Sequence, residues 1–347
     1  MKALVYKGPG QVALEEKEKP GLIASTDAIV KVIKTTICGT DLHILKGDVK
    51  EVAYGTILGH EGIGIVEETG SNVSNFKKGD HVLISCITSC GKCEYCRKSM
   101  YSHCQNGGWI LGHLIDGTQA EYVRIPYADT SLYHIPESTN EESLVMLSDI
   151  LPTGYECGVL NGQVQPGTTV AIVGAGPIGL AALTTAQFFS PAAIIMIDPD
   201  SNRLEVAKKM GATHAINNSQ ENAVDAIMAL TEYEGVDTAM EAVGIPATFE
   251  LCTQIIRPGG KIANIGVHGK SVSLALENLW SKNITITTRL VDTYTTPMLL
   301  KIVTSRKMDP GIFITHRFKF SEIETAYTTF GNAAKENALK VIISNEF

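Results

Sequence analysis

Short apolar segments separated by turn residues dominate the first 150 positions of this 347-residue chain. The segments AIVKVI at 28–33, GIGIVEE at 62–68 and HVLIS at 81–85 have the length and composition of β-strands, and Gly79-Asp80 is typical of a turn. No run of helical segments interrupts them. We therefore predict a β-rich domain over residues 1–150.

Residues 166–290 show a different pattern, in which strand-like and helical segments alternate. The strand-like TVAIVG precedes a helical stretch from Pro177 to Phe189, which is followed by AIIMID and the helical SNRLEVAKKMGA. Repeated βα units imply a parallel sheet with right-handed crossovers. The last segment, 293–347, ends in the strand-like ALKVIIS and is too short to fold alone. We predict an α/β protein in which a doubly wound domain, residues 151–292, is inserted into the β-rich domain.

Composition and charge narrow the classes of function. The chain is 44% hydrophobic and 19% charged, with a net charge of −8 and no lysine or arginine run longer than a pair. A protein that binds along phosphates normally has a basic face, so we do not expect a nucleic-acid partner. No charged residue occurs from Thr168 to Ile197, a stretch long enough to cross a membrane. Its glycines and prolines stand where turns and a helix start are expected. We therefore predict buried strands and a helix rather than a membrane span. The N-terminus lacks the apolar core of a secretion signal, which favours the cytoplasm.

The segment Gly174-Ala175-Gly176-Pro177-Ile178-Gly179 fits the G-x-G-x-x-G pattern of dinucleotide-binding turns. It follows the apolar strand VAIV and opens a helix. The first two glycines allow the turn and the close approach of a pyrophosphate, and the third lets helix and strand pack closely. The helix N-terminus supplies free N–H groups for phosphates, and proline suits its first turn. The alternative is a glycine-rich turn that binds no nucleotide.

Asp198 stands at the end of the next predicted strand, where it is placed to accept hydrogen bonds from the hydroxyls of the adenosine ribose. Its charge would repel a 2′-phosphate, so we predict NAD rather than NADP as the coenzyme. The alternative is that Asp198 ends a strand and caps the next helix. Arg203 lies nearby in the sequence as a further candidate contact, and its alternative is an exposed helix arginine.

Four cysteines, Cys90, Cys93, Cys96 and Cys104, stand close together in the sequence. Four thiolates at such spacing are a standard structural zinc arrangement without an open coordination position. An iron–sulfur cluster is the main rival, because cysteines also hold such clusters. Free core cysteines are the other alternative. In a chain without a secretion signal, the clustering favours metal binding over a disulfide framework.

Together with this cysteine loop, the motifs ICGTDLH at 37–43, GHEGIGIV at 59–66 and GAGPIG at 174–179 resemble the zinc-containing medium-chain alcohol dehydrogenase family over essentially the whole chain. The resemblance implies a GroES-like catalytic domain joined to a Rossmann domain. It also implies two zinc ions per chain, one catalytic and one structural. The implied reaction is hydride transfer between NAD and a primary or secondary alcohol, which gives an aldehyde or a ketone. Homo-oligomers are usual in the family, and a tetramer is expected here.

Alcohol oxidation removes a proton and a hydride, and a zinc ion with three protein ligands and one open position assists it as a Lewis acid. By resemblance, Cys38 and His60 are the first two ligands. Asp149 is the third, because it stands shortly before a Thr-Gly-aromatic sequence, where many relatives carry cysteine and others aspartate. Glu61 resembles the glutamate beneath the metal, and a surface carboxylate is its alternative. Cys157 does not match a ligand position and is expected in the core.

Two residues near Cys38 resemble the proton relay of the family. Thr40 lies two residues after Cys38, and its hydroxyl is placed to take the alcohol proton. His43 matches the position from which family members pass the proton through the ribose to solvent. The alternatives are a helix cap for Thr40 and an exposed histidine without a role for His43.

The resemblance also assigns further contacts. The positions that resemble loops near the nicotinamide ring are Val243, Gly244, Ile265, Gly266, Val267 and Leu290. Lys340 is placed like a basic residue that meets the pyrophosphate, with a solvated lysine as the alternative. The candidates for the substrate pocket are Cys86, Trp109, Ile110 and Leu111, although apolar residues belong more often to the core.

Two other functions fit parts of this pattern. A polyol or amino-alcohol dehydrogenase of the same family, of the sorbitol or threonine type, would add a polar pocket group, of which GGWILGH at 107–113 gives no clear sign. A non-enzymatic regulator that binds zinc and nucleotide would not need the open metal position that Cys38, His60 and Asp149 imply. We therefore expect a small-molecule partner, an alcohol, aldehyde or ketone.

Overall fold

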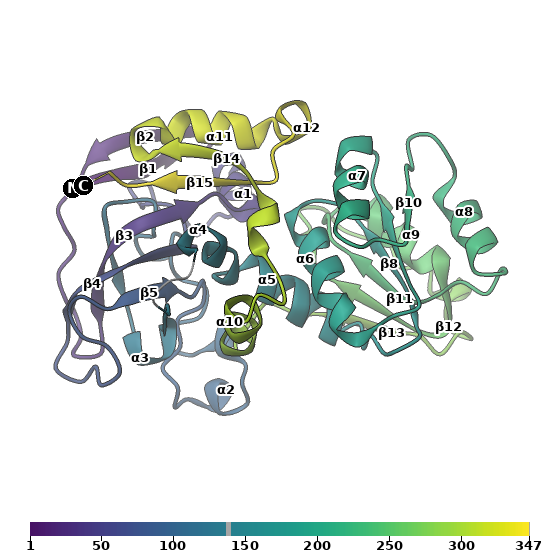
Figure 1. Ribbon diagram of the computed structural model, residues 1–347, viewed down its shortest axis with the longest axis horizontal. Helices are drawn as coiled ribbons and strands as arrows, with labels where there is room; N and C mark the ends of the chain where they lie inside the picture. Colours follow the sequence, from purple (N-terminus) through teal and green to yellow (C-terminus); the bar gives the residue numbers. More distant parts are fainter. Residues whose placement is uncertain (137–139, 347) are drawn as a thin grey trace. The chain divides into compact units, whose positions relative to one another are not determined.

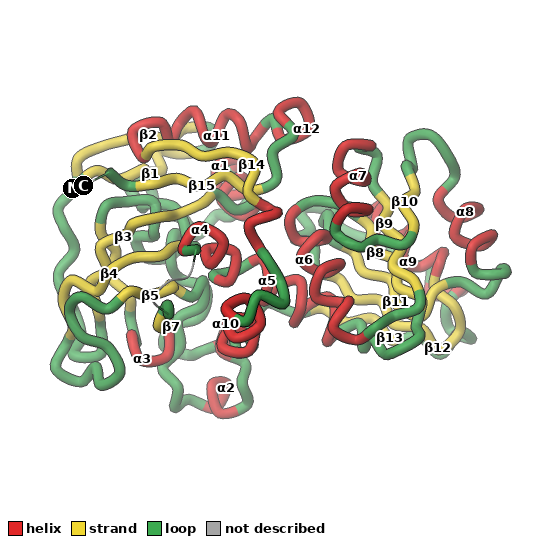
Figure 2. Tube along the Cα trace, in the orientation of Figure 1, coloured by secondary structure: helices red, strands yellow, loops and turns green. Residues whose placement is uncertain are grey.

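The computed structural model describes residues 1–136 and 140–346, which fall into two compact units. One unit contains Met1–Asp149 and Asp292–Phe347, and the other contains Ile150–Val291. Figure 1 follows the chain by colour through the two units, and Figure 2 marks their helices and strands. The middle of the sequence is thus an insertion into a unit that is built from the segments before and after it.

A seven-stranded sheet in the order β14-β15-β3-β4-β5-β7, with β6 paired to β3, forms the centre of the first unit. Its pairs are antiparallel except for β14 with β15, and a separate hairpin joins β1 to β2. This architecture confirms the predicted β-rich fold. The strands are β1 (Lys2–Gly8), β2 (Gln11–Glu16), β3 (Ala28–Thr36), β4 (Gly62–Thr69), β5 (His81–Ile84), β6 (Tyr122–Ile125), β7 (Leu132–His134), β14 (Ile314–Lys319) and β15 (Lys340–Ser344).

The late segment of the chain completes this sheet. Strand β15 lies antiparallel to β3, with Ile342 opposite Thr36 and Ile343 opposite Thr35. Val341, Ile342 and Ile343 are fully buried, so the apolar run VII is held by the burial of both of its faces. This pairing fixes the position of Lys340, the first residue of β15, and Lys340 lies close to the site described below.

Short helices occur in the first unit although the pattern of residues 1–150 indicated none. Within residues 1–150, α2, α3 and α4 have four residues each, which is too short to produce a clear 3.6-residue period, and the eight-residue α1 begins within the ICGTDLH motif and ends after it. The helices of this unit are α1 (Gly39–Lys46), α2 (Glu94–Arg97), α3 (Ala128–Ser131), α4 (Glu141–Leu144), α10 (Thr296–Thr304), α11 (Ile323–Gly331) and α12 (Ala333–Glu336).

The second unit has a six-stranded parallel sheet in the order β10-β9-β8-β11-β12-β13, which is the strand order of a Rossmann sheet. The predicted doubly wound fold is confirmed. The strands are β8 (Thr169–Val173), β9 (Ala193–Ile197), β10 (His214–Ile216), β11 (Val236–Glu241), β12 (Ile256–Asn264) and β13 (Thr285–Thr288). The helices are α5 (Ile150–Thr153), α6 (Pro177–Ala186), α7 (Ser201–Lys209), α8 (Ala223–Leu230) and α9 (Pro246–Ile255), and a π-helical turn covers Gly154–Leu160.

The uncharged stretch 168–197 forms β8, α6 and β9 of this unit. Val170, Ile172, Ile195 and Ile197 are buried in the sheet, and α6 packs against β8. The missing charges therefore reflect strands that are covered on both faces. Within the described residues, we find no helix with the length and hydropathy that crossing a bilayer requires.

Candidate metal centres and coenzyme site

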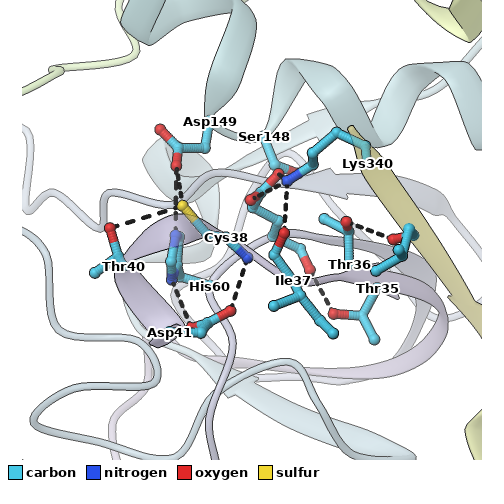
Figure 3. A network of polar contacts seen from close by, with 12 residues as sticks. Thr35, Thr36, Ile37, Cys38, Thr40, Asp41, His60, Ser148, Asp149 and Lys340 are labelled. Carbon is cyan, nitrogen blue, oxygen red and sulfur yellow. Dashed lines mark hydrogen bonds and ion pairs between the residues drawn. The ribbon is translucent and has the colours of Figure 1, made fainter. Parts of the chain in front are cut away.

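The turn between β3 and α1 positions the first candidate metal ligand. Cys38 stands immediately before α1 in an extended conformation, and its backbone N–H donates to the Asp41 carboxylate at 2.9 Å. This bond is half of a capping box, which fixes the angle at which the chain enters the helix. The Cys38 thiol is buried and points toward His60 and Asp149 (Figure 3).

The structure brings four predicted residues together. The donor atoms of Cys38, His60, Glu61 and Asp149 all lie within 4.8 Å of one another, and all four residues are buried. The Asp149 carboxylate oxygen lies 3.5 Å from the Cys38 sulfur and 3.4 Å from Nε2 of His60. A thiolate, an imidazole and a carboxylate are the donors that zinc takes in catalytic sites, so this set fits a zinc ion. Cys157, by contrast, is a buried cysteine of the other unit.

The electrostatics of the cluster also fit a bound cation. Burial raises the pKa of the Cys38 thiol, and the nearby Asp149 carboxylate raises it further. Burial likewise raises the pKa of Glu61 and outweighs the lowering by Lys340. Burial opposes a charged His60, yet hydrogen bonds to Asp149 and Cys38 outweigh it and raise the pKa of His60 well above its usual value. Several acidic groups thus crowd a dry site where a divalent cation would offset their charge.

A buried hydrogen-bonded chain that the sequence analysis missed lies behind His60. One Asp41 carboxylate oxygen faces Nδ1 of His60 at 3.6 Å, which is beyond hydrogen-bond distance, and the other accepts from Nε2 of Gln119 at 3.1 Å. The Tyr327 hydroxyl donates to Oε1 of Gln119 at 2.8 Å. Burial raises the pKa of Tyr327 well above its usual value, so the hydroxyl stays a donor and fixes the direction of the Gln119 amide. A carboxylate behind a metal-binding histidine orients the ring. The only sequence feature that could have indicated this chain is the presence of Asp41 in the ICGTDLH motif.

Lys340 differs from the sequence prediction. Its side chain is 1% exposed, and its ammonium lies 2.7 Å and 3.0 Å from the two carboxylate oxygens of Glu61. It also donates to the Ile37 carbonyl at 3.1 Å (Figure 3). Lys340 is therefore the buried partner of Glu61. The predicted contact with the pyrophosphate and the alternative of a solvated lysine are both wrong. Burial lowers the pKa of Lys340, but the Glu61 carboxylate outweighs this and raises it.

The relay candidates lie on α1. Oγ1 of Thr40 is 3.7 Å from the Cys38 sulfur, so the hydroxyl is next to the candidate metal ligand. His43 is partly exposed, and its Nδ1 lies 2.8 Å from the Asp48 carboxylate. The two relay candidates are three residues apart and share one face of the helix.

The four cysteines of the loop also converge, with donor atoms within 4.8 Å of one another. The Cys90 backbone N–H donates to the Cys104 sulfur at 3.2 Å, and the Asn106 amide donates to the Cys90 sulfur at 3.5 Å. Burial raises the pKa of Cys90, but the backbone N–H groups of Lys92 and Cys93 and the Asn106 amide lower it to about 6. These donors stabilise the Cys90 thiolate, whereas burial raises the pKa of Cys96 to about 12, so the convergence of the four sulfur atoms is the stronger indication of a metal site. All eight cysteines of the chain are free of disulfides.

The glycine-rich turn lies between β8 and α6, as predicted. Gly176 caps α6 and Pro177 is its first residue, while Ile178 is half-buried in the first turn. A side chain at Gly179 would overlap the carbonyl oxygen of Gly174, so the close packing of helix and strand depends on glycine. The first-turn N–H groups of α6 have no partner within the helix and are available to a phosphate.

Asp198 is bound to this turn more tightly than the sequence indicated. One carboxylate oxygen accepts from the Ala175 N–H at 2.7 Å, and the other accepts from the Asp200 N–H at 2.9 Å. Asp198 is 5% exposed, and it is Asp200 that caps α7. The Arg203 guanidinium lies 3.9 Å from Asp200 and close to Gly176. Asp198 therefore holds the glycine-rich turn, and its contact with the ribose stays a prediction.

The other predicted coenzyme contacts lie after β11, after β12 and after β13. The Glu241 carboxylate accepts from the N–H groups of Val243 and Gly244 at 2.9 and 2.8 Å, and its carbonyl accepts from those of Ile265 and Gly266. Glu241 thus forms hydrogen bonds with both the loop after β11 and the loop after β12. Of the predicted contacts, the exposed apolar side chains are Val243, Val267 and Leu290.

The predicted pocket residues divide into two groups. Leu111 and Cys86 are fully buried, which is the behaviour of core residues. Trp109 and Ile110 are only partly buried. The Trp109 ring stacks on His113 with centroids 4.2 Å apart. Only the second group therefore retains surface that a substrate can contact.

Comparison with known proteins gives the same assignment as the motifs. An alcohol dehydrogenase GroES-like domain matches residues 24–137, and a zinc-binding dehydrogenase domain matches residues 177–305. A solved zinc dependent alcohol dehydrogenase from Streptococcus pneumonia is 58% identical, with a TM-score of 0.96 over 100% of this chain and 99% of that chain. An alcohol dehydrogenase of Cupriavidus necator is 36% identical over 99% of this chain and 98% of its own. An NADP-dependent isopropanol dehydrogenase of Thermoanaerobacter brockii is 32% identical over 99% of both chains.

The fold and the donor cluster define a metal-dependent dehydrogenase with its own dinucleotide domain, and the comparisons agree with this class. The chain belongs to the zinc-containing medium-chain alcohol dehydrogenase family, as the motifs predicted. It is a zinc-dependent oxidoreductase that acts on alcohols.

The buried Glu61–Lys340 pair gives a prediction for stability. Lys340→Met should lower the free energy of unfolding by about 3–5 kcal/mol, because it leaves a buried carboxylate without its cation. Urea denaturation followed by fluorescence measures the change. The double variant Lys340→Met, Glu61→Gln should recover most of the loss. Lys319→Met, which breaks an exposed pair with Glu346, is the matched control and should leave the midpoint nearly unchanged. A Lys340→Met midpoint equal to that of the control would contradict the prediction.

Proposed function

We propose that this chain catalyses the NAD-linked interconversion of a primary or secondary alcohol with its aldehyde or ketone. The observation that carries the proposal is the buried cluster of Cys38, His60, Glu61 and Asp149. Structural zinc sites are closed by four protein donors, such as the four thiolates of the cysteine loop. A mixed set in which one carboxylate is already paired with Lys340 leaves a coordination position for a substrate.

In this proposal, Cys38, His60 and Asp149 would hold the catalytic zinc, and Glu61 would remain the partner of Lys340. A zinc ion bound there supplies Lewis-acid polarisation of the alcohol oxygen. The residues proposed to hold the second, structural zinc are Cys90, Cys93, Cys96 and Cys104.

The proposed proton path begins at Thr40. Its hydroxyl takes the proton that leaves the alcohol, and His43 carries a proton toward solvent. The 3.7 Å distance from Thr40 to the Cys38 sulfur and the partial exposure of His43 support these roles. Removal of the proton leaves negative charge on the alcohol oxygen, and this favours loss of a hydride, which a bound NAD would accept.

NAD is the proposed coenzyme. A buried carboxylate at Asp198 would repel a 2′-phosphate, and this argues for NAD although the Thermoanaerobacter brockii relative is named for NADP. The residues proposed to contact NAD besides Asp198 are Gly174, Gly176, Pro177, Ile178, Gly179, Arg203, Val243, Ile265, Gly266, Val267 and Leu290.

We further propose a homotetramer in the cytoplasm. Trp280 and Leu276 are 77% and 58% exposed on the second unit, which supports an interface between copies of the chain. The eight cysteines form no disulfide, and this supports a reducing compartment.

Purified enzyme should contain two zinc ions per chain with separable roles. Cys38→Ser should remove one ion and abolish turnover without unfolding the chain, and Cys93→Ser should remove the other and mainly lower thermal stability. Asp149→Asn should weaken binding of the catalytic ion, because a neutral amide is a poorer ligand for a cation. Mass spectrometry of the metal content, together with thermal melts, measures these effects. One zinc per chain in fully active wild-type enzyme would refute the assignment.

The proton path predicts a selective loss of turnover. Thr40→Val keeps the shape of the side chain but removes the hydroxyl, so kcat for alcohol oxidation should fall by about 10²–10⁴. The affinity for NAD, measured by titration, should change little. His43→Gln should have a smaller effect. Wild-type turnover in Thr40→Val would rule out this path.

Coenzyme choice is tested by the specificity constants for both coenzymes, measured with a panel of alcohols. Hydrogen bonds to a charged group contribute about 1.5–3 kcal/mol. The wild-type kcat/KM should therefore favour NAD by roughly tenfold or more. Asp198→Ala should raise the KM for NAD and narrow this ratio. Both coenzymes should bind less tightly to this variant, because the Ala175 N–H loses its acceptor. A wild-type preference for NADP would overturn the assignment, and no reduction of either coenzyme with any alcohol would overturn the proposed reaction.

A further inference from the structure

The turn at the end of helix α1 brings an acidic residue, Asp48, next to His43. The helix ends at Lys46, and Gly47 takes the left-handed conformation, with a φ of 85°. The Gly47 N–H donates to the Ile44 carbonyl at 2.9 Å, and the Asp48 N–H donates to the His43 carbonyl at 3.0 Å. This left-handed cap, for which glycine is favoured, reverses the chain so that Asp48 lies against the last turn of the helix.

The Asp48 carboxylate contacts one nitrogen of the His43 ring. Its Oδ2 lies 2.8 Å from Nδ1. An ionised carboxylate only accepts hydrogen bonds, so Nδ1 of a neutral ring carries the hydrogen and Nε2 keeps the lone pair. The His43 and Asp48 side chains are 30% and 45% exposed, so the pair adds little to stability. Its effect is on the orientation and the tautomer of the ring.

We propose that Asp48 is a positioning residue that holds His43 as the Nδ1–H tautomer, with Nε2 free to accept the proton released by the substrate. The inference rests on the proposed function, in which Thr40 and His43 carry that proton. When Nε2 gains the proton, the ring becomes an imidazolium whose charge the Asp48 carboxylate balances. Water then removes the proton, and Asp48 itself is never protonated. An orienting carboxylate of this kind fixes the tautomer of a histidine base and stabilises its charged form.

Histidine ring nitrogen shifts test the contact without reference to turnover. In zinc-loaded enzyme with ¹⁵N-labelled histidine, the His43 signals are assigned by their loss in His43→Gln, and they should show the Nδ1–H pattern. Asp48→Ala should shift them toward the Nε2–H form that a free histidine ring prefers. Glu51→Gln is the matched control, because Glu51 is an exposed acidic residue near the same turn, and it should leave the wild-type pattern.

Kinetics test whether the contact serves the proton path. Asp48→Ala should lower kcat for alcohol oxidation by about tenfold, a part of what a general base contributes, with the KM for the coenzyme unchanged. The double variant His43→Gln, Asp48→Ala should be no slower than His43→Gln, because Asp48 acts through the ring. Glu51→Gln should match wild type.

Two results would overturn the proposal. One is a wild-type ring pattern in Asp48→Ala, and the other is a double variant whose loss equals the product of the two single losses. Wild-type turnover in His43→Gln would overturn the relay and the role of Asp48 with it. The ring shifts would then show whether the Asp48 contact itself forms, and so separate the two failures.

Discussion

Buried negative charge is the constraint on which the catalytic unit depends. Cys38, Asp41, Glu61 and Asp149 are all at least nine-tenths buried, and burial raises the pKa values of the first three. An uncompensated buried ion costs several kcal/mol, so the fold has to supply positive partners. Lys340 is one such partner, and a zinc ion provides the charge that the protein itself lacks. Metal binding and the stability of this site are therefore coupled.

The same constraint explains why the late segment of the chain belongs to the first unit. The cation that faces Glu61 comes from the first residue of β15, and the pairing of β15 with β3 sets its position. Tyr327, from α11, fixes the Gln119 amide that bonds Asp41. Helix α11 and strand β15 thus provide polar contacts to the metal cluster in addition to apolar packing, and the Rossmann unit is inserted before them.

Local features of the sequence were sufficient for part of this site. The cysteine loop and the glycine-rich turn each lie within one short segment, residues 90–104 and 174–179, so spacing and residue type predicted them. The fold of both units followed from alternating apolar segments and βα repeats. The contacts that were missed join residues far apart in sequence: 78 positions separate Asp41 from Gln119, and 279 separate Glu61 from Lys340. The resemblance matched Lys340 to a basic residue that meets the pyrophosphate, but only the packing of β15 determines that the lysine meets Glu61. The Asp48 contact depends on a left-handed helix cap, which the pattern of a short helix does not predict.

The long separation between Glu61 and Lys340 has a consequence for how the protein matures. While the chain is being synthesised, Glu61 has no ammonium partner until residue 340 has left the ribosome. The cysteine loop needs only residues 90–104 to converge, and the Rossmann strands end at Thr288. The loop and the nucleotide domain can therefore fold before residue 340 is available, whereas the mixed metal cluster acquires its full charge balance only once Lys340 can reach Glu61.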